Sequence, residues 1–477
     1  MPNTPPDRDS GRHTTDSITR RIDSLPGLTR GHVTLAVLLT TLFFFDVVDL
    51  TSFAYVAPAL LEEWDLSIGQ LGTLTSTAFA GMFAGGLVGG WLADRFGRRP
   101  MVLTGVLLFS AASLAAAFAP NPELLGACRF VTGFGLQMTT GAVLVIVSET
   151  FPKPFRGRVM ALILGVSLVG APVIALIARL VVPIGLWHIV FIVGALGVVP
   201  AAFAFRTLPE SPRWLALNGQ GDRADAQLSE YERQAVAKYG ALLPVTPDEA
   251  TAAEPGTTSV LAIFTSGLFG RTVVAVLAFC GLVLLNYGFG AWLPTILVER
   301  GYPQDDALTF AFILSFASMI GALVAIMFID RIERKTAIAA GVLIMAVCYL
   351  AVGFVESVPV LLIAGFAANM LAQTVSATMY SYVPEMFPTQ VRGVGAGLAN
   401  SMGRFAGIFS SIILAAVLSA FAVEGVFLYL TAVAVVMAAV VCFGPVIGIR
   451  ASRAQHQRER ALTTSDQSAL TAVQPFK

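Results

Sequence analysis

Four ionisable residues stand out because they lie deep inside long apolar stretches of the sequence. Asp46 and Asp49 are three positions apart, which places both on one face of a helix. Arg129 and Arg404 lie in two other apolar stretches, one in each half of the chain. A charge at the centre of a membrane-spanning helix costs about 2.5–3.5 kcal/mol on insertion scales, so each needs a reason. Such residues either move protons and bind charged ligands or form permanent ion pairs between helices.

An arginine in a dry cavity is a natural partner for a carboxylate, because its guanidinium donates two parallel hydrogen bonds. Arg404 is therefore the first candidate for binding an anionic substrate, and an interhelical hydrogen bond is the alternative. Other polar and aromatic residues of the apolar stretches are candidates for lining the same pocket, although most aromatics in such helices only pack or face lipid. They are Tyr55, Asn286, Tyr287, Trp292, Asn369, Gln373, Tyr380 and Tyr382.

The composition indicates what surrounds these residues. Of the 477 residues, 56% are hydrophobic and 13% are charged, whereas about a quarter would be charged in a soluble chain. The deficit indicates that most of the chain meets lipid. The net charge is zero, so nothing favours nucleic-acid binding. The four cysteines lack the spacing of a metal site or a redox pair, so we expect reduced, packed thiols and no metal.

The apolar stretches predict the fold class. A membrane-spanning helix needs about 20 mostly apolar residues, and a helix satisfies its own backbone hydrogen bonds in lipid. Twelve such runs predict an all-α membrane protein with twelve transmembrane helices. The predicted helices cover 33–60, 69–93, 101–119, 124–148, 159–182, 186–205, 271–297, 307–329, 336–355, 359–384, 392–420 and 426–449.

The basic residues predict the orientation. Most of the 30 Lys and Arg fall in the tails and the even-numbered loops, which the positive-inside rule places in the cytoplasm. We therefore expect a multi-pass protein of the cell membrane with both termini cytoplasmic. The predicted parts are an N-terminal tail (1–32), a six-helix bundle (33–205), a cytoplasmic loop with short helices (206–270), a second six-helix bundle (271–449) and a C-terminal tail (450–477).

The two halves of the chain repeat at an offset of 236 residues. Six helices per half keep both halves in the same orientation, as parallel repeats require. Such repeats place a substrate site between the halves, near the middle of the membrane. The matching pairs include Asp94 with Asp330, Arg95 with Arg331, Arg98 with Arg334, Glu149 with Glu385 and Arg156 with Arg392.

Acids and arginines gather at the predicted inner ends of the helices. Pairs between the two halves would close the cytoplasmic side and would have to part when it opens. The alternative is that these charges only anchor helix ends and set the topology. The candidate gate residues are Asp94, Arg95, Arg98, Glu149, Arg156, Glu210, Arg213, Asp330, Arg331, Glu385 and Arg392.

Three of these segments resemble known families. The stretch 90–99 (GWLADRFGRR) resembles the loop 2–3 signature of the major facilitator superfamily. The stretch 209–215 (PESPRWL) resembles the motif after helix 6 in sugar porters and their organic-acid relatives, and 129–135 (RFVTGFG) is similar to their helix 4. The resemblance implies the major facilitator fold, with two parallel six-helix pseudo-repeats, and a gating role for the inner-face charges.

A narrower resemblance concerns the buried acids. The stretch 46–60 (DVVDLTSFAYVAPAL) resembles helix 1 of aromatic-acid:proton symporters, and 402–405 (MGRF) is similar to their helix 11. The resemblance implies that Asp49 carries the proton, that Asp46 assists and that Arg129 is the partner. Loss of water favours a protonated carboxyl and a nearby arginine favours an ionised one, so a carboxyl that alternates between them loads and releases protons. A permanent Asp–Arg pair that ties helices together is the alternative.

The sequence also limits the source of energy. No lysine follows a glycine, so the chain lacks a GxxxxGK phosphate loop and uphill transport must use an ion gradient. We expect proton-coupled import of a small organic acid, an aromatic or related carboxylate, by a monomer that is not an enzyme and needs no cofactor. A sugar or polyol:proton symporter, a drug or metabolite antiporter and a non-transporting receptor are the alternatives, in that order.

Overall fold

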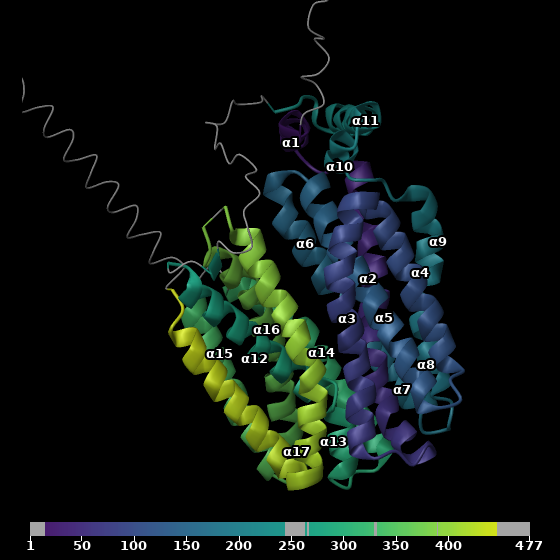
Figure 1. Ribbon diagram of the computed structural model, residues 1–477, viewed down its shortest axis with the longest axis vertical. Coiled ribbons are helices and arrows are strands. Elements are labelled where there is room, and N and C mark those ends of the chain that lie inside the picture. Colours follow the sequence, from purple (N-terminus) through teal and green to yellow (C-terminus); the bar gives the residue numbers. More distant parts are fainter. Residues whose placement is uncertain (1–14, 244–262, 265–266, 329–331, 389, 446–477) are drawn as a thin grey trace, which may run out of the picture. The chain divides into compact units, whose positions relative to one another are not determined.

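Helices make up the regular structure of the protein. The computed structural model describes residues 15–243, 263–264, 267–328, 332–388 and 390–445, and every regular element in these ranges is helical (Figure 1). Eleven helices in this part of the chain are long and apolar enough to cross a membrane. The all-α fold class predicted from the sequence is therefore confirmed. The described residues form two compact units, and each is considered by itself.

The first unit contains the described residues of Met1–Glu254, together with Tyr287–Met319 and Arg404–Val426. In Figure 1 its purple and blue helices lie side by side. Its apolar helices are α2 (Arg30–Glu63), α3 (Ile68–Phe96), α4 (Arg98–Ala117), α5 (Pro122–Thr150), α6 (Lys153–Ser167), α7 (Gly170–Val181), α8 (His188–Ala195) and α9 (Val198–Thr207).

Local sequence signals begin three of these helices. The Thr29 side chain accepts a hydrogen bond from the backbone of His32 and so caps α2. Ser67 and Gln70 form a reciprocal capping box at the start of α3. Asn121 caps α5, whose first residue is a proline. Each cap satisfies a backbone N–H that has no partner inside its helix, which fixes where the helix starts.

Two predicted spans in the first half of the chain each appear as a pair of helices. α6 and α7 replace the predicted helix 159–182, and α8 and α9 replace 186–205. The backbone at each junction is a tighter 3₁₀ turn, because Val169 N–H bonds to the Val166 carbonyl and Leu196 N–H to that of Val193. Each pair still forms one continuous apolar span, so the junctions change the helix boundaries and leave the number of crossings as predicted.

Glycines bring α3 and α5 into direct backbone contact. A Cβ atom on Gly81 would lie 2.0 Å from the Phe130 carbonyl oxygen, and one on Gly85 would lie 2.3 Å from that of Phe134. No side chain fits in either space. Gly133 on α5 has the same relation to Ala78 on α3, so the contact uses small residues on both helices.

The second unit contains the described residues of Pro255–Asn286, Ile320–Gly403 and Phe427–Lys477. α15 and α16 pack against each other within it. α12, α14 and α17 contribute residues to both units, and α13 belongs to the first. The helices of this half of the chain are α12 (Phe269–Gly290), α13 (Leu293–Glu299), α14 (Gln304–Phe328), α15 (Arg334–Phe354), α16 (Val358–Glu385) and α17 (Arg392–Cys442).

α17 runs through 51 residues, where the sequence predicts two helices, 392–420 and 426–449. A straight helix of that length would extend about 76 Å, far beyond the ~30 Å hydrocarbon core. Ala422 interrupts it with non-helical dihedral angles (φ 55°, ψ −163°). The chain therefore turns at Ala422, and eleven apolar helices are consistent with twelve crossings.

Three amphipathic helices form a small cap at one end of α2–α9 (Figure 1). They are α1 (Thr15–Asp23), α10 (Pro212–Leu217) and α11 (Gly221–Tyr239), and they are called the three-helix cap below. α10 and α11 lie within 206–270, where the sequence predicts short helices. α1 lies within the predicted tail. The apolar side chains that join the three helices are Ile18, Ile22, Leu25, Leu215, Ala224, Leu228, Tyr231 and Ala235.

Two charged residues of α1 hold the cap in place. The Arg21 guanidinium donates to both Glu232 carboxylate oxygens, at 2.7 and 3.0 Å, and to Asp225 at 2.5 Å. The hydrogen bond with Glu232 raises the pKa of Arg21 above its ordinary value. Asp23 accepts hydrogen bonds from the Lys153 backbone at 2.8 Å and from the Arg156 side chain at 3.2 Å. α1 thereby connects α11 to the beginning of α6.

We predict that Arg21→Gln loosens α1, because an amide cannot form the two-pronged bond with Glu232. The loss of a partly exposed ion network of about 1 kcal/mol should speed backbone amide exchange in residues 15–25 about fivefold. Hydrogen–deuterium exchange read by mass spectrometry measures this rate. Arg20→Gln, at the exposed neighbouring position, is the matched control. Equal exchange in the two variants would contradict the prediction.

Candidate functional site

The two predicted proton-handling aspartates lie on one face of α2 and are buried. The exposed fractions of Asp46 and Asp49 are 6% and 0%. α2 packs against α6, α7 and α8, so little open space remains around its middle. Both carboxyl groups are therefore inside the first unit, where only protein groups can replace the water they have lost.

Arg129 on α5 supplies the opposite charge for Asp49, as the sequence predicts. Its Nη1 lies 3.7 Å from Asp49 Oδ2, and its guanidinium carbon lies 5.1 Å from the centre of the Phe53 ring. A distance of 3.7 Å is too long for a hydrogen bond. Asp49 Oδ2 and Arg129 Nη1 have no hydrogen-bond partner among the described residues. The pair thus balances two charges but leaves hydrogen-bonding groups unused.

Ser113 on α4 contacts the other oxygen of Asp49. Its hydroxyl oxygen is in short hydrogen-bond contact with Asp49 Oδ1 and lies 3.0 Å from the Phe191 carbonyl oxygen on α8. A serine hydroxyl has a single proton and can donate it to only one of these acceptors. When Asp49 is ionised, Ser113 donates to Asp49. When Asp49 is protonated, Asp49 donates to Ser113 and Ser113 donates to Phe191, so the same geometry suits both protonation states.

Gly194 on α8 makes room for this contact. A Cβ atom at this position would lie 2.6 Å from Asp49 Oδ1 and 3.0 Å from Ser113 Oγ. A carboxyl oxygen of a buried, paired side chain cannot move aside freely. The closest approach of α8 to α2 and α4 therefore depends on the missing side chain of Gly194.

Asp46 has a different set of neighbours. Thr140 on α5 lies close to its carboxyl group, and the Arg404 guanidinium on α17 is near enough to interact with it electrostatically. Asp46 Oδ1 has no hydrogen-bond partner among the described residues. The two aspartates, one helical turn apart, thus face two different arginines, Arg129 and Arg404.

Arg404 is held by aromatic and sulfur contacts as well as by charge. Its Nη1 donates to the Tyr287 hydroxyl at 3.1 Å and lies 3.9 Å from Met82 Sδ. The Tyr287 ring meets the Phe79 ring edge-on, with centres 4.6 Å apart. Arg404 is only half-buried, whereas Arg129 is 4% exposed. Of the two arginines, Arg404 is therefore the more accessible to a ligand.

The other predicted pocket residues divide between the two units. Tyr55 and Trp292 lie in the first unit with exposed fractions of 7% and 1%, and Trp292 Nε1 has no hydrogen-bond partner among the described residues. Five more predicted residues lie in the second unit. They are Asn286, Asn369, Gln373, Tyr380 and Tyr382.

The five residues of the second unit differ in their surroundings. Tyr382 is fully buried, and its hydroxyl donates to the Pro445 carbonyl at 2.8 Å. Asn286 donates to the Ser376 hydroxyl at 3.2 Å. Tyr380 is 51% exposed, with its ring edge-on to Phe279. Asn369 and Gln373 are partly buried on α16. A pocket that combines them with Arg404 stays a prediction.

Four of the predicted gate residues of the first half form one network. Arg98 donates to both Glu149 oxygens at 3.1 Å and pairs with Asp94 at 3.0 Å. Glu210 accepts hydrogen bonds from the backbone of Arg98 and Arg99, and so caps α4. Gly97 precedes them with φ of +105°, and a Cβ there would lie 2.3 Å from Glu210. Glycine is therefore required for both the backbone turn and the cap.

The second half repeats the central ion pair of this network. Arg334 and Glu385 form a salt bridge, and they stand 236 residues after Arg98 and Glu149. Asp330 and Arg331, the predicted partners in this repeat, lie outside the described residues. Each bridge joins two residues of its own half. A gate between the halves stays a prediction.

The remaining gate residues have local contacts or are exposed. Arg95 lies 5.6 Å from the rings of Trp91 and Phe96 on its own helix. Arg156 donates to the Phe151 carbonyl as well as to Asp23. Arg213 is partly buried on α10, and Arg392 is exposed at the start of α17.

Sequence reasoning missed Ser113, Thr140 and Gly194. Each is a small residue within an apolar helix, where serine and threonine usually bond to their own backbone and glycine usually serves helix packing. Only its position opposite an aspartate distinguishes each of them from other residues of its type. A spacing signal within one helix cannot reveal such a position.

Comparisons with known proteins find similar sequences among membrane transporters. The family model described as Major Facilitator Superfamily matches residues 38–411 and, in a second match, 315–473. The niacin transporter of Acinetobacter baylyi is 30% identical over 422 residues, which cover 88% of this chain and 95% of that protein. The 4-hydroxybenzoate transporter of Pseudomonas putida is 31% identical over 392 residues, which cover 80% and 86%.

A solved structure has a similar fold. The xylose transporter of E. coli, in a partially occluded inward open conformation, matches with a TM-score of 0.69 at 17% identity. The match covers 85% of this chain and 97% of that one. At this identity the likeness is one of fold.

We predict that Gly194→Ala destabilises the protein, because the added methyl group would meet Asp49 and Ser113. Overpacking of this kind costs about 1–3 kcal/mol. The thermal unfolding midpoint of detergent-purified protein measures the effect. The control is Gly141→Ala on α5, where nothing lies within 4 Å of the new Cβ and where alanine should be neutral or slightly stabilising. If both variants unfold at the same temperature, Gly194 does not have the role assigned to it.

Proposed function

Because the chain belongs to the Major Facilitator Superfamily and is a multi-pass membrane transporter, we propose that it imports a small organic acid together with protons, by alternating access. The proposed substrate class is an aromatic or related carboxylate. Asp49 is proposed as the proton carrier, with Asp46 and Arg129 assisting, and Arg404 as the group that binds the substrate carboxylate.

The contact between Asp49 and Ser113 carries the proton part of the proposal. A protonated Asp49 has Ser113 as an acceptor, and an ionised Asp49 has Ser113 as a donor and Arg129 as a counter-charge. Neither state leaves the buried carboxyl without a partner. A carboxyl that is stable in both states can take up a proton on one side of the membrane and release it on the other.

The surroundings of Arg404 support the proposal that the substrate is an organic acid. Arg404 is half-buried, its side chain is fixed by Tyr287, and a guanidinium binds a carboxylate through two hydrogen bonds. The nearby rings of Tyr287 and Phe79 offer flat apolar surface to an aromatic ring. The relative from P. putida is named for 4-hydroxybenzoate, an aromatic carboxylate.

Binding and coupling are connected through Asp46. Its carboxyl group and a bound substrate would compete for the same cation, Arg404. Protonation of Asp46 would free Arg404 for the substrate, and arrival of the substrate would favour protonation of Asp46. The two events therefore promote each other, which is the requirement for symport.

We further propose that both termini are cytoplasmic and that six-helix halves 33–205 and 271–449, joined by 206–270, move against each other. The repeated bridges, Arg98 with Glu149 and Arg334 with Glu385, support this proposal because each braces one half at its predicted inner end. The charges around them would close the cytoplasmic side in one state and separate in the other.

We predict that Asp49→Asn abolishes uphill transport. Asparagine keeps the shape and the hydrogen bond with Ser113 but cannot release a proton. Vesicles with an imposed gradient of one pH unit allow at most about tenfold accumulation for one proton per substrate. Uptake of labelled 4-hydroxybenzoate or niacin, whichever the unmodified protein accumulates, should fall to near equilibrium with the outside, while exchange across the membrane persists.

Asp46→Asn is the matched control for this prediction. It should retain part of the accumulation, because Asp49 still carries a proton. Full accumulation by the Asp49→Asn protein under a pH gradient alone would show that another residue is the carrier.

A separate prediction concerns Arg404. Arg404→Gln removes a charged hydrogen-bond donor worth about 1.5–3 kcal/mol, so the KM for the acid should rise roughly tenfold to a hundredfold. The variant should also lose the preference for the acid over its methyl ester, measured by competition for uptake. Tyr287→Phe, which removes only the hydroxyl that fixes Arg404, should have a smaller effect. An unchanged KM and ester preference in Arg404→Gln would refute the assignment.

A further inference from the structure

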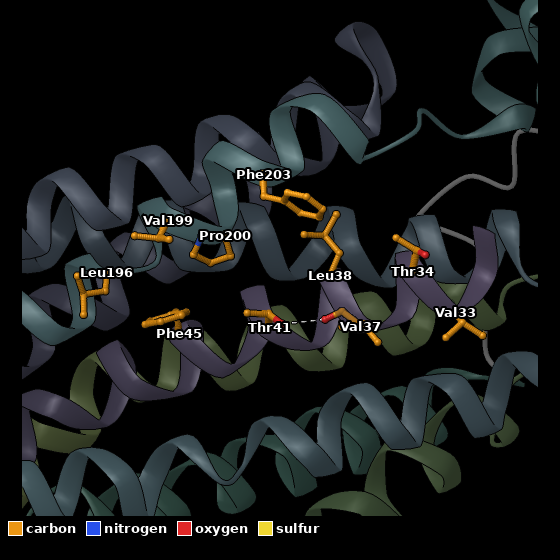
Figure 2. A pocket seen from close by; sticks show the side chains of 10 residues that line it. All are labelled: Val33, Thr34, Val37, Leu38, Thr41, Phe45, Leu196, Val199, Pro200 and Phe203. Carbon is orange, nitrogen blue, oxygen red and sulfur yellow. Dashed lines mark hydrogen bonds between the residues drawn. The ribbon is translucent and has the colours of Figure 1, made fainter. Parts of the chain in front are cut away.

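The outer surface of the first unit has an apolar groove between α2 and the α8–α9 segment. Figure 2 shows side chains of both segments facing each other across it. Its volume is about 690 Å³, within the ~300–1,000 Å³ of ligand pockets. Residues from Val33 to Phe45 line one wall, and residues from Leu196 to Phe203 line the other.

The groove is apolar and open to the outside. Val37, Val199 and Phe203 have exposed fractions of 61%, 63% and 58%. Eight of the ten lining residues are apolar and two are threonines. The hydroxyl of Thr41 already donates to its own helix, at the Val37 carbonyl (Figure 2). The lining therefore offers little to orient a polar substrate, and both walls belong to helical segments long and apolar enough to cross a membrane.

Two exposed arginines stand at one end of the groove. Arg30 begins α2, one helical turn before Val33, and Arg206 lies one turn after Phe203 near the end of α9. Both lie at the end of the unit that carries the three-helix cap, because the Gly31 backbone donates to Gln234 of α11 and α9 leads directly into α10. The groove thus has an apolar body and a positively charged mouth.

The length of the groove matches one leaflet of a bilayer. Val33 and Phe45 are twelve residues apart on α2, which corresponds to about 18 Å along the helix axis. Half of a hydrocarbon core is about 15 Å thick. The arginines therefore stand where lipid headgroups begin, and the apolar walls extend through the region of the acyl chains.

We propose that this groove is a binding site for a glycerophospholipid with an anionic headgroup. One acyl chain lies between α2 and α9, and the headgroup phosphate binds Arg30 and Arg206. Negative lipid phosphates match the charge of the mouth, and an acyl chain matches the lining. A polar substrate or an apolar protein helix fits only one of these two features.

The first experiment tests the headgroup. Native mass spectrometry of the purified protein should show tighter binding of phosphatidylglycerol than of phosphatidylcholine with the same acyl chains. Arg30→Gln/Arg206→Gln should raise the apparent Kd for phosphatidylglycerol roughly tenfold to thirtyfold. The control Arg20→Gln/Arg158→Gln removes the same charge from two other exposed positions and should leave the Kd unchanged. Equal affinity for the two lipids, or equal effects of the two double variants, would overturn the proposal.

The second experiment tests the acyl chain. Phosphatidylglycerol with a photoreactive acyl chain should label residues 33–45 or 196–203 of the unmodified protein. Val37→Trp should abolish this labelling by filling the groove, whereas Leu162→Trp, at an exposed site on α6, should not. Labelling outside the groove, or labelling that survives Val37→Trp, would show that the groove does not hold the lipid chain.

Discussion

Asp49 has no exposed surface, and a carboxylate in that position is stable only when protein groups replace the water it has lost. Three further helices contribute to this replacement. Arg129 on α5 supplies an opposite charge and Ser113 on α4 a hydrogen bond, and the missing side chain of Gly194 on α8 leaves room for the contact. Removing a charged partner from such a site costs about 3–5 kcal/mol, because the remaining charge stays buried. The need to satisfy one carboxyl group therefore holds α2, α4, α5 and α8 in a single arrangement. Their close glycine contacts are the packing that makes this arrangement possible.

Charged side chains at the ends of the helices are also paired with opposite charges, and these pairs stay within each half. Arg98 pairs with Glu149 in the first half, and Arg334 pairs with Glu385 at the equivalent position of the second. Each bridge joins two helices of its own half, so each half is braced independently. A transporter whose halves move against each other needs such internal rigidity, because the motion is then confined to the contact between them. The buried pair in the middle and the bridges at the ends thus serve one requirement, which is a stiff half.

The helices themselves could be predicted because hydrophobic length and charge are local properties. The apolar runs located the long helices, and charged residues marked many of their ends. The exceptions are backbone changes that hydropathy does not register. Val169 and Leu196 end 3₁₀ turns inside apolar runs, and Ala422 carries the change of direction between the last two predicted helices without a proline or glycine at that position. Burial and neighbouring helices decide such backbone changes, and a single run of residues contains no record of them.

The sequence by itself determined which residues are costly in a membrane: Asp46, Asp49, Arg129 and Arg404 are charged wherever they are placed, so their positions in apolar runs were sufficient to select them. The resemblance of the sequence implied Arg129 as the partner of Asp49, and the tertiary structure decided the other neighbours. It placed the Arg404 guanidinium within electrostatic range of Asp46, and it brought Ser113 into a position where one hydroxyl proton can serve two protonation states of Asp49. The reason is physical: the cost of burying a charge belongs to the residue, whereas the interactions that offset it act over a few ångströms between helices far apart in the chain.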